Sequence, residues 1–445
     1  MSEKVKAQDE TIKGQSEKIK SLEEKINLLV NGRKSHTSST PPSHDIGRSN
    51  KKNLRTKSNR KSGGQPGHKG HNLEMKVTPD EVKDYIPEFC DACKSDLRNE
   101  SSVVNDRRQE IIIPPVIIHY LEHRTHSRTC SCCGVTSTAQ FPDHIKAPIQ
   151  YGTGIADIVS YLSVYQYIPY KRMVAMFKDL FNLPISEGTI DNMLARSAQK
   201  AKPAYTALQV QIQESEVVGA DETGSSINGK KGWFHTWQNE MVTFIVASLN
   251  RGYDTIKTYF PDGFPSTIYV SDCWAAQLKT LAFLHQLCLV HLLRELTNFA
   301  DALSCDWSKE MKQLFQDAIV LKHQLNESDY DQTQPAVLLL ETRLDELLAM
   351  DYSKRHRKIK AFTKRLIKNR QSIFTFLYYS NVPHHNNGAE RAIRTIKVKT
   401  KVSGQFKCEE GANRFAVLRS IIDTAIKNSK NIFEELANLA QLSPT

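Results

Sequence analysis

The stretch SEVVGADETG, residues 215–224, decides the expected fold because it reads as an apolar strand that ends in a carboxylate, Asp221. A glycine-containing turn is expected directly after that carboxylate. The later stretch WFHTWQNEMVTFIVAS, residues 233–248, alternates on either side of Asn239-Glu240 and predicts a β-hairpin. This part of the chain is therefore expected to form a sheet.

A second junction between a strand and a carboxylate follows in STIYVSDCWAAQ, residues 266–277. The strand expected from Thr267 to Val270 stops at Asp272, and a helix is expected just after it. If the two strands are neighbours in one mixed sheet, Asp221 and Asp272 emerge at the same edge, where ligand sites of α/β sheets form. Either aspartate alone has a simpler explanation, because Asp is a common turn-former.

Glu390 is a lone acid in a basic stretch, since no other Asp or Glu occurs from Tyr352 to Cys408. Its neighbours are cationic: Arg391, Arg394, Lys397, Lys399 and Lys401. One interpretation is a solvated helix in which Glu390 pairs with Arg394, an interaction worth about 0.2–0.5 kcal/mol. The other is an acidic metal ligand inside a surface that holds a polyanion.

The three carboxylates together favour a metal site. Two aspartates only half-fill a site for a hard cation, which wants several oxygen ligands, and Glu390 supplies a third. Without a cation, three clustered carboxylates would repel and raise one another's pKa. We therefore expect Asp221, Asp272 and Glu390 to bind two Mg²⁺ or Mn²⁺ ions for phosphoryl displacement, with the basic run gripping the flanking phosphates.

The cysteine spacing predicts a second kind of metal site. CDAC and CSCCG are paired CxxC knuckles whose four thiolates suit tetrahedral structural Zn²⁺: Cys90, Cys93, Cys130 and Cys133. The interval between them is rich in β-formers, as in a zinc ribbon. Chance cysteines, or a site completed by His123 or His126, are the alternatives, and Cys132 is the spare thiol.

Composition points to a nucleic-acid partner and away from a membrane. The formal net charge is +11 over 445 residues, and Lys and Arg gain affinity by releasing counterions from phosphates. The N-terminus is hydrophilic and no apolar run reaches about 18 residues, so we expect a soluble cytosolic protein without a membrane span.

The N-terminal part carries two further signals. Val5, Ile12, Ile19 and Ile26 recur every seven residues, which predicts a short self-associating coiled coil, although a frayed charged helix is the alternative. The following segment, residues 33–76, is rich in Ser, Pro, Gly and basic residues and reads as a disordered tether that also contacts the DNA backbone.

Residues 168–200 predict a pair of helices separated by a break at Leu183-Pro184, with Ser186 capping the second. A helix, a short turn and a helix can place the second helix in a major groove. An ordinary helical hairpin in a protein core looks the same, so that alternative stays open.

The order of motifs ADETG, YVSDCWAAQ, HQLCLVHLLREL, NNGAERAIRTIKVKTKVSG and GANRFAVLRSIIDTAIKNS resembles the transposases of the bacterial insertion sequence 66 group. The zinc knuckles, the GGQPGHKGH linker and the N-terminal coil are similar too, so the likeness spans nearly the whole chain. It implies a DDE catalytic domain with a ribonuclease-H-like fold and a helical insertion, and a triad of Asp221, Asp272 and Glu390.

The resemblance also draws attention to accessory residues. Cys288 and His291 match a CxxH motif that similar enzymes place near the active site, and their spacing puts both on one helical face. One Cys and one His are too few for a closed zinc site, and an ordinary packed helix explains them equally well. Arg391 and Arg394 are the other accessory candidates.

The expected fold is a multidomain α+β chain. Its parts are a coiled-coil helix (1–31), a basic disordered linker (32–84), a zinc ribbon (85–145), a helix-turn-helix-like region (146–210), a ribonuclease-H-like mixed α/β catalytic domain (211–405) with a helical insertion at about 290–380, and a C-terminal helical element (406–445).

The expected function is a transposase that binds element ends and joins a freed 3′-hydroxyl to target DNA, with no covalent protein–DNA intermediate. Expected partners are double-stranded DNA, further copies of the chain and element-encoded helper proteins, in the bacterial cytosol at the nucleoid. Two rivals are a ribonuclease-H-like nuclease without strand transfer, and a non-enzymatic zinc-ribbon regulator whose carboxylates are structural.

Overall fold

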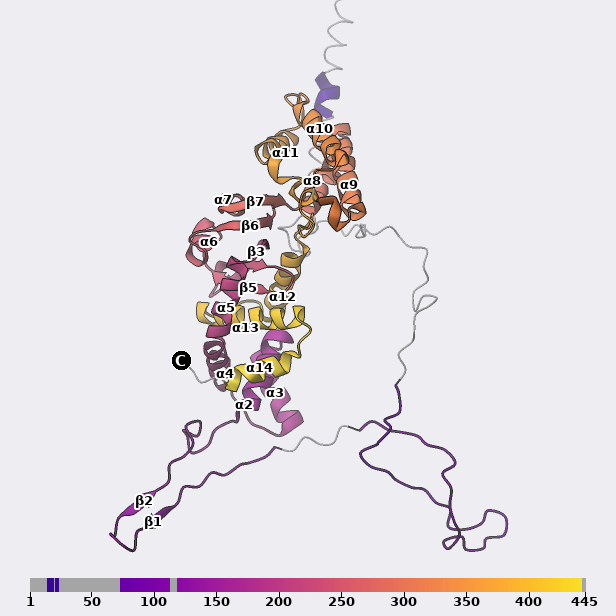
Figure 1. Cartoon of the computed structure of the whole chain (residues 1–445), viewed down its shortest axis with the longest axis vertical. Helices are drawn as coiled ribbons and strands as arrows, with labels where there is room; N and C mark the ends of the chain where they lie inside the picture. The colour runs from indigo at the N-terminus through magenta and orange to yellow at the C-terminus, as the bar shows by residue number, and fades with distance from the viewer. Residues whose placement is uncertain (1–13, 20, 24–72, 113–117, 331, 442–445) are drawn as a thin grey trace, which may run out of the picture. The chain divides into compact units, whose positions relative to one another are not determined.

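The structure is a computed structural model that describes residues 14–19, 21–23, 73–112, 118–330 and 332–441 (Figure 1). The chain divides into two units: Arg48–Ile118 forms one, and Met1–Gly47 with His119–Thr445 forms the other. The larger unit holds the central sheet and the helices around it. Residues 14–19 and 21–23 are helical, and the rest of the predicted coil (1–31) and most of the predicted linker (32–84) lie outside the described residues.

A mixed sheet of five strands forms the centre of the larger unit. Its strands are β3 (Val217–Ile227), β4 (Lys230–Gln238), β5 (Thr243–Ser248), β6 (Phe264–Ser271) and β7 (Ala282–Leu287). They lie in the order β5-β4-β3-β6-β7. The first three form an antiparallel meander, and β6 and β7 run parallel to β3. The predicted hairpin around Asn239-Glu240 is confirmed as the β4–β5 connection.

The prediction that the first strand ends at Asp221 is wrong. β3 continues for six residues beyond it to Ile227, and the turn to β4 falls at Asn228-Gly229, where both residues have positive φ angles of 51° and 71°. Gly224 does not make a turn; it lies opposite Trp233, and a Cβ added to it would be 3.6 Å from that indole ring. In the sequence alone, a glycine that makes room for a large side chain on the neighbouring strand cannot be told from a glycine that forms a turn.

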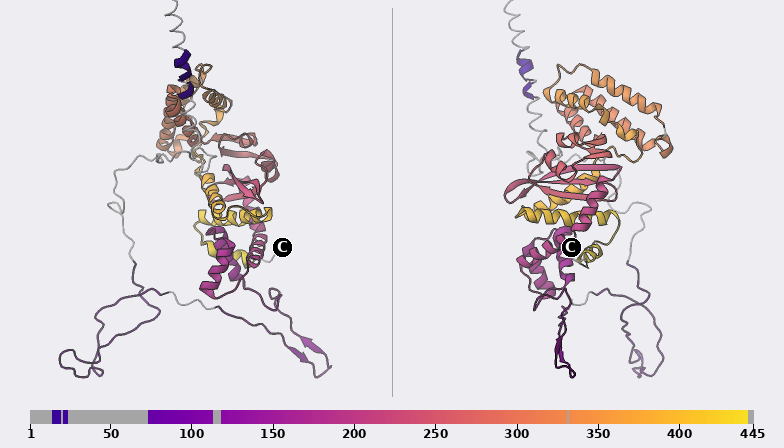
Figure 2. Two further views of the ribbon diagram at one scale, coloured as in Figure 1. Left: turned by 180° about the vertical axis from the view of Figure 1, so that it is seen from behind. Right: turned by 60° about the vertical axis from the view of Figure 1, so that its left-hand side comes forward.

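The edge strand β5 is covered by α13 (Glu409–Lys427). The backbone N–H groups of Ile245 and Thr243 point away from β4 and donate to the side chains of Ser420 at 2.9 Å and Thr424 at 3.1 Å. Because an unpaired edge strand invites pairing with other chains, these hydroxyls close the sheet on this side. Figures 1 and 2 show α13 on the β5 side of the sheet and the insertion helices on the β7 side.

Four helices stand between β7 and the segment that carries Glu390: α8 (Leu289–Leu303), α9 (Asp306–Gln324), α10 (Pro335–Ala349) and α11 (Arg357–Lys368). One short 3₁₀ turn, Glu327–Tyr330, lies between α9 and α10, and two more follow α11 at Arg370–Ser372 and Thr375–Leu377. Their apolar faces share one core with Ile268, Val270 and Leu287 of the sheet. The helices are therefore anchored to β6 and β7 by a continuous core. The chain then returns in α12 (Asn387–Ser403), which packs against β3 and β4.

The remaining helices precede the sheet, connect its strands β5, β6 and β7, or follow it. They are α2 (Thr153–Ser160), the π-helical turn Tyr161–Tyr165, α3 (Tyr170–Phe181), α4 (Glu187–Lys200), α5 (Lys202–Gln213), α6 (Tyr253–Tyr259), α7 (Ala275–Lys279) and α14 (Ile432–Gln441). The predicted cap is present, because Ser186 Oγ accepts a hydrogen bond from Thr189 N–H at 3.0 Å. α3 ends at Asn182, whose φ of 48° terminates the helix.

We expect Ser420→Ala to destabilise the sheet, because it leaves the Ile245 N–H buried without an acceptor, at a cost of about 1–3 kcal/mol. Ser308→Ala is the matched control, since its hydroxyl is equally buried but has no hydrogen-bond partner. Urea unfolding followed by tryptophan fluorescence measures both. Equal effects of the two substitutions would contradict a bonding role for Ser420.

Candidate active site

The register of the central strands sets the first two candidate residues level with each other. β3 pairs in parallel with β6 as far as Gly219 and Val270. Asp221 and Asp272 each lie two residues beyond that pair, and Asp272 directly follows β6, as predicted. Asp272 Oδ1 accepts a hydrogen bond from Trp274 N–H at 2.9 Å, which holds the carboxylate at the strand end. One end of the parallel β3–β6 pair therefore carries both aspartates.

The carboxylates at this edge act on one another. Burial raises the pKa of Asp221 well above its usual value, and the neighbouring charges of Asp272, Glu222 and Glu390 raise it further. One interaction opposes them, a hydrogen bond of 2.8 Å from Glu222 N–H to Asp221 Oδ1. Asp221 therefore stands in a negative, poorly compensated environment that favours a proton or a cation.

Three hydrogen bonds fix the start of α12, which carries Glu390, to the sheet and to α8. Asn386 Nδ2 donates to the carbonyl of Ala220 at 2.6 Å, one residue before Asp221. Asn386 N–H donates to Cys288 Sγ at 3.2 Å, and Leu289 N–H donates to the carbonyl of His384 at 2.9 Å. Segments far apart in the sequence are thereby held together at one point.

Two glycines permit this close approach. A Cβ on Gly388, in the first turn of α12, would lie 2.3 Å from Gln238 Nε2 on β4. A Cβ on Gly219 of β3 would lie 2.7 Å from Asn386 Oδ1 and from the same amide nitrogen. Both positions therefore lack space for a side chain. The glycines in VVGADETG and NNGAER, otherwise unexplained by the sequence, let α12 lie against the sheet beside Asp221.

Glu390 is not a solvated surface residue. Its side chain is 14% exposed, whereas Arg394, its predicted surface partner, is 71% exposed and lies 3.9 Å away. On its other side, His291 Nδ1 lies 3.7 Å and Arg294 Nη1 3.8 Å from Glu390 Oε1. None of these separations is a hydrogen bond. The predicted i,i+4 pair with Arg394 is therefore present as a loose ion pair, whereas the expectation that Glu390 is solvated is wrong.

Glu390 also faces the CxxH motif. Cys288, His291 and Glu390 each place one ligand atom within 4.8 Å of the other two. Within the described residues, this is the one group of three or more His, Cys, Asp or Glu side chains that lie close enough together to hold a metal ion. Glu390 does not form such a group with Asp221 and Asp272 in this structure. Its charge nevertheless reaches Asp221. Burial lowers the pKa of His291, against the attraction of Glu390 and Asp272, so its imidazole is neutral at pH 7.

A comparison with protein families decides the relationship of this chain. The family model described as "Transposase IS66 family" matches residues 149–414, which include both aspartates, the CxxH motif and Glu390. The chain belongs to this transposase family. No curated protein matches the chain.

The basic residues of the transposase around Glu390 divide into two groups. Arg391, Arg394 and Lys397 are exposed along α12. Lys399 turns inward instead, where its Nζ lies 3.4 Å from the carbonyl of Ser163 and burial lowers its pKa to about 8. Lys399 is therefore not available to grip phosphate, in contrast to the prediction for the whole basic run.

No sequence pattern predicted the ion pair that the buried Glu222 forms beside the aspartates. Glu222 Oε1 accepts hydrogen bonds from Arg251 Nε at 3.0 Å and Nη2 at 2.7 Å, and its other oxygen accepts one from Gln277 at 3.0 Å. The Arg251 guanidinium lies 3.7 Å from the ring centre of Trp274 and 4.6 Å from that of Trp233. Glu222 is thus compensated where Asp221 is not. The position of Glu222 next to Asp221 is the sequence signal for this compensated carboxylate.

The two cysteine knuckles fall in different units and share one backbone structure. In the smaller unit, Cys90 N–H donates to Ser95 O at 2.9 Å and Lys94 N–H donates back to Cys90 O, with Lys94 at φ 61°. In the larger unit, Cys130 makes the same bonds with Val135 and Gly134, with Gly134 at φ 75°. Both knuckles are therefore five-residue turns that present their two thiols together, Cys93 beside Cys90 and Cys133 beside Cys130.

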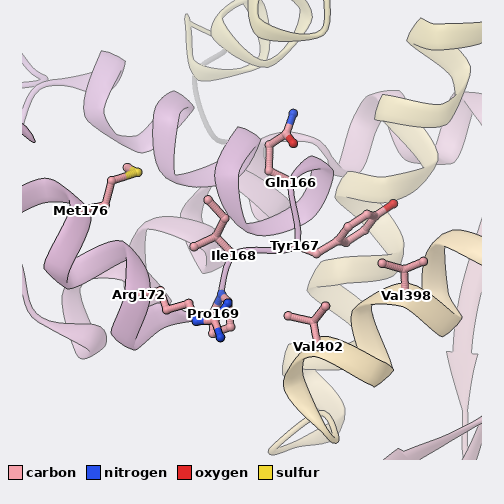
Figure 3. Close-up of a pocket in the computed structure, with 8 residues that line it drawn as sticks. All are labelled: Gln166, Tyr167, Ile168, Pro169, Arg172, Met176, Val398 and Val402. Atoms are coloured by element: carbon pink, nitrogen blue, oxygen red, sulfur yellow. The ribbon is translucent and has the colours of Figure 1, made fainter.

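A surface hollow of the larger unit lies away from the carboxylates. Figure 3 shows its walls, which come from residues 166–176 before and within α3 and from Val398 and Val402 of α12. None of the candidate catalytic residues lines it. Within the described residues, no helix is both long and apolar enough to cross a bilayer.

The transposase should tolerate a side chain at residue 388 only if Gln238 is removed. Gln238 Oε1 is held by Lys427 Nζ at 2.7 Å, so Gly388→Ala should cost about 1–3 kcal/mol through overpacking. In a Gln238→Ala background the same change should be neutral or stabilising by up to about 1 kcal/mol, because Ala favours helices over Gly. Urea unfolding of the four variants in this cycle measures the sign. Equal costs in both backgrounds would refute the steric explanation.

Proposed function

We propose that this transposase cleaves DNA strands and transfers the freed 3′-hydroxyl to target DNA, with Asp221, Asp272 and Glu390 as its catalytic carboxylates. The observation that carries the proposal is the convergence of three chain segments on one negative site. The β3–β6 register sets the aspartates level, and the Asn386–Ala220 hydrogen bond brings the start of α12 to them. The charges of Asp272 and Glu390 both act on Asp221.

The residues at this site fit a divalent cation. Glu390 Oε1 is buried without a hydrogen-bond partner, and Asp221 carries uncompensated repulsion, so a cation would relieve both. All three donors are carboxylate oxygens, the ligands that Mg²⁺ and Mn²⁺ prefer. Asp221, Asp272 and Glu390 would therefore hold the ions and would supply the negative charge that keeps them at the reacting phosphate.

When bound, two such ions activate a water or a 3′-hydroxyl and neutralise charge on the reacting phosphate. The chain itself supplies position and charge. Asp272 is held by the Trp274 N–H, and Asp221 lies on the central strand of a sheet covered on both edges, so neither needs reorganisation. The exposed Arg391 and Arg394 bind the phosphates that flank the cleaved bond. A Ser or Tyr nucleophile is not required.

The catalytic domain is proposed to be ribonuclease-H-like, spanning residues 211–405 with a helical insertion. The mixed five-stranded sheet, the first aspartate on its central strand and the helices α8–α11 between Asp272 and Glu390 support this assignment. The family comparison supports the transposase role.

The DNA-binding parts are proposed to lie before this domain. The pair α3 and α4 is the helix-turn-helix candidate, and it keeps an exposed face on α4 at Asn192, Arg196 and Gln199. The paired CxxC spacing supports a proposed structural Zn²⁺ site of Cys90, Cys93, Cys130 and Cys133, and each knuckle presents its two thiols on a five-residue turn. In the first knuckle, a hydrogen bond with Ser95 lowers the pKa of Cys93 to about 7, which favours the thiolate that zinc requires.

The assembly is proposed to be a homo-oligomer on DNA, joined through the N-terminal coil, in the bacterial cytosol at the nucleoid. Element-encoded helper proteins are proposed as further partners. These assignments rest on the heptad spacing of residues 5–26, on the net charge of +11 and on the family.

Glu390→Gln tests the catalytic assignment. The substitution keeps the size of the side chain but removes the charge that a cation needs, so we expect strand cleavage to fall about 10²–10³-fold, equivalent to about 3–4 kcal/mol. Affinity for element-end DNA, measured by gel shift, should stay within a few-fold of wild type. Glu409→Gln is the matched control, because Glu409 also lies in the first turn of a helix but is exposed.

Cleavage near the wild-type rate by Glu390→Gln, in both Mg²⁺ and Mn²⁺, would refute the triad. Loss of activity in both variants would point to folding or DNA binding instead. Joining of a labelled 3′-hydroxyl end to a second duplex separates a transposase from a nuclease that only cuts. Metal-dependent cleavage of any kind excludes a purely regulatory protein.

A further inference from the structure

The three side chains of Cys288, His291 and Glu390 form a second donor set at the edge of the proposed catalytic site. Cys288 is the residue that precedes α8, and His291 follows one turn into that helix, so both point to one side. Glu390 meets them from the first turn of α12. One ligand atom of each lies within 4.8 Å of the other two.

Two of these atoms lack the partners that buried polar atoms normally have. His291 Nδ1 and Glu390 Oε1 are buried and make no hydrogen bond, although they are 3.7 Å apart. That separation is too long for a hydrogen bond, and both atoms belong to the group whose ligand atoms lie within 4.8 Å of one another. A ligand that accepts electron pairs from both atoms would satisfy them.

Burial raises the pKa of the Cys288 thiol to about 11, so this sulfur keeps its proton unless a cation displaces it. It accepts a hydrogen bond from Asn386 N–H at 3.2 Å, and it lies at the N-terminus of α8, where the helix dipole favours an anion. Thiolate, imidazole and carboxylate together form a donor set typical of Zn²⁺ and similar borderline-soft ions. Mg²⁺ and Ca²⁺ prefer oxygen donors alone.

We propose that Cys288 Sγ, His291 Nδ1 and Glu390 Oε1 bind a divalent ion of the zinc class, and that this ion inhibits the transposase by holding Glu390 away from Asp221 and Asp272. Binding releases the thiol proton of Cys288 to solvent. The thiolate and the carboxylate together balance the charge of the ion. The inhibitory part rests on the proposed catalytic role of Glu390; the binding part does not.

The charges around the site are compatible with this ion. Arg294 Nη1, 3.8 Å from Glu390 Oε1, competes with the ion, but the Arg294 side chain is 29% exposed and water screens part of its charge. Arg394 approaches the other carboxylate oxygen. Asp272 and Glu295 both act on His291 and add negative potential nearby. With three protein ligands, a fourth position stays open for water.

Titration of the full chain with Co²⁺ tests the binding. Co²⁺ is a spectroscopic substitute for Zn²⁺, and its bond to a thiolate gives a near-ultraviolet charge-transfer band. Protein purified with Zn²⁺ in its CxxC knuckles should bind one further Co²⁺ with such a band. Cys288→Ser should lose the band, and His291→Gln should lower the Co²⁺ affinity at least about tenfold.

Cys305→Ser is the matched control, because Cys305 precedes α9 with the same extended backbone that Cys288 has before α8. Its band should equal that of wild type. An unchanged band in both Cys288→Ser and His291→Gln, or no further Co²⁺ bound by wild type, would overturn the site. The second variant covers the case in which Cys288→Ser fails to fold, which circular dichroism of each variant reports.

Strand cleavage in Mg²⁺ with added Zn²⁺ tests the inhibition. Zn²⁺ should inhibit cleavage by wild type and by Cys305→Ser at the same concentration. Half-inhibition of Cys288→Ser should need a Zn²⁺ concentration about tenfold higher. Equal inhibition of all three would overturn the regulatory role. Because the Co²⁺ titration needs no cleavage, its result remains decisive for the site even if Glu390→Gln proves active.

Discussion

The hydrogen bond from the Asn386 side chain to the carbonyl of Ala220 is the constraint on which the site depends. It joins the start of α12 to the central strand across 166 residues of sequence, one position before Asp221. The contact is short because neither Gly219 nor Gly388 has a side chain to hold the two backbones apart. The position of Glu390 therefore follows from packing of small residues, and its own ionic contacts, all between 3.7 and 3.9 Å, contribute little.

The same close approach concentrates negative charge. Glu222 is compensated by Arg251 and Gln277, whereas Asp221 has one N–H donor against the charges of three neighbouring carboxylates. Such a cluster costs folding stability, which is typical of functional sites. The structure also gives Glu390 two sets of neighbours, the aspartates through charge and the CxxH motif through contact. Oxygen donors alone favour hard ions such as Mg²⁺, whereas sulfur and imidazole donors favour softer ions such as Zn²⁺. The type of metal present is therefore suited to decide which set of neighbours Glu390 joins.

Local sequence patterns predicted the parts of the site that local structure determines. The junction of a strand with Asp272 and the absence of other acids around Glu390 were sufficient to select these residues. The likeness of Cys288 and His291 to a motif was also visible, but Glu390, the third side chain of their group, comes from α12, about a hundred residues later, where no spacing rule applies. The partners of Glu222, 29 and 55 residues away, were hidden for the same reason.

The errors have physical causes. β3 was expected to end at Asp221 because Gly224 resembles a turn signal. In the structure, Gly224 instead lies within the strand and accommodates the ring of Trp233 on the neighbouring strand. Lys399 was expected on the DNA-binding surface because the sequence does not show which residues of a basic stretch face inward. That depends on what the helix packs against, which here is the π-helical turn that contains Ser163. Tertiary contacts decided both cases.

The most direct measurement of the central claim is the thermal unfolding of wild type and Asp221→Asn with and without Mg²⁺. The folded pKa of Asp221 lies above its unfolded value, so the ionised carboxylate costs stability as the pH rises beyond the ordinary Asp range of about 4. At pH 7.5 without Mg²⁺, Asp221→Asn should therefore raise the Tm, by roughly 2–4 °C for each kcal/mol relieved. Mg²⁺ should raise the Tm of wild type and leave that of Asp221→Asn unchanged. A lower Tm for Asp221→Asn without Mg²⁺, together with the same Mg²⁺ increment in both proteins, would contradict a carboxylate cluster built to hold a cation.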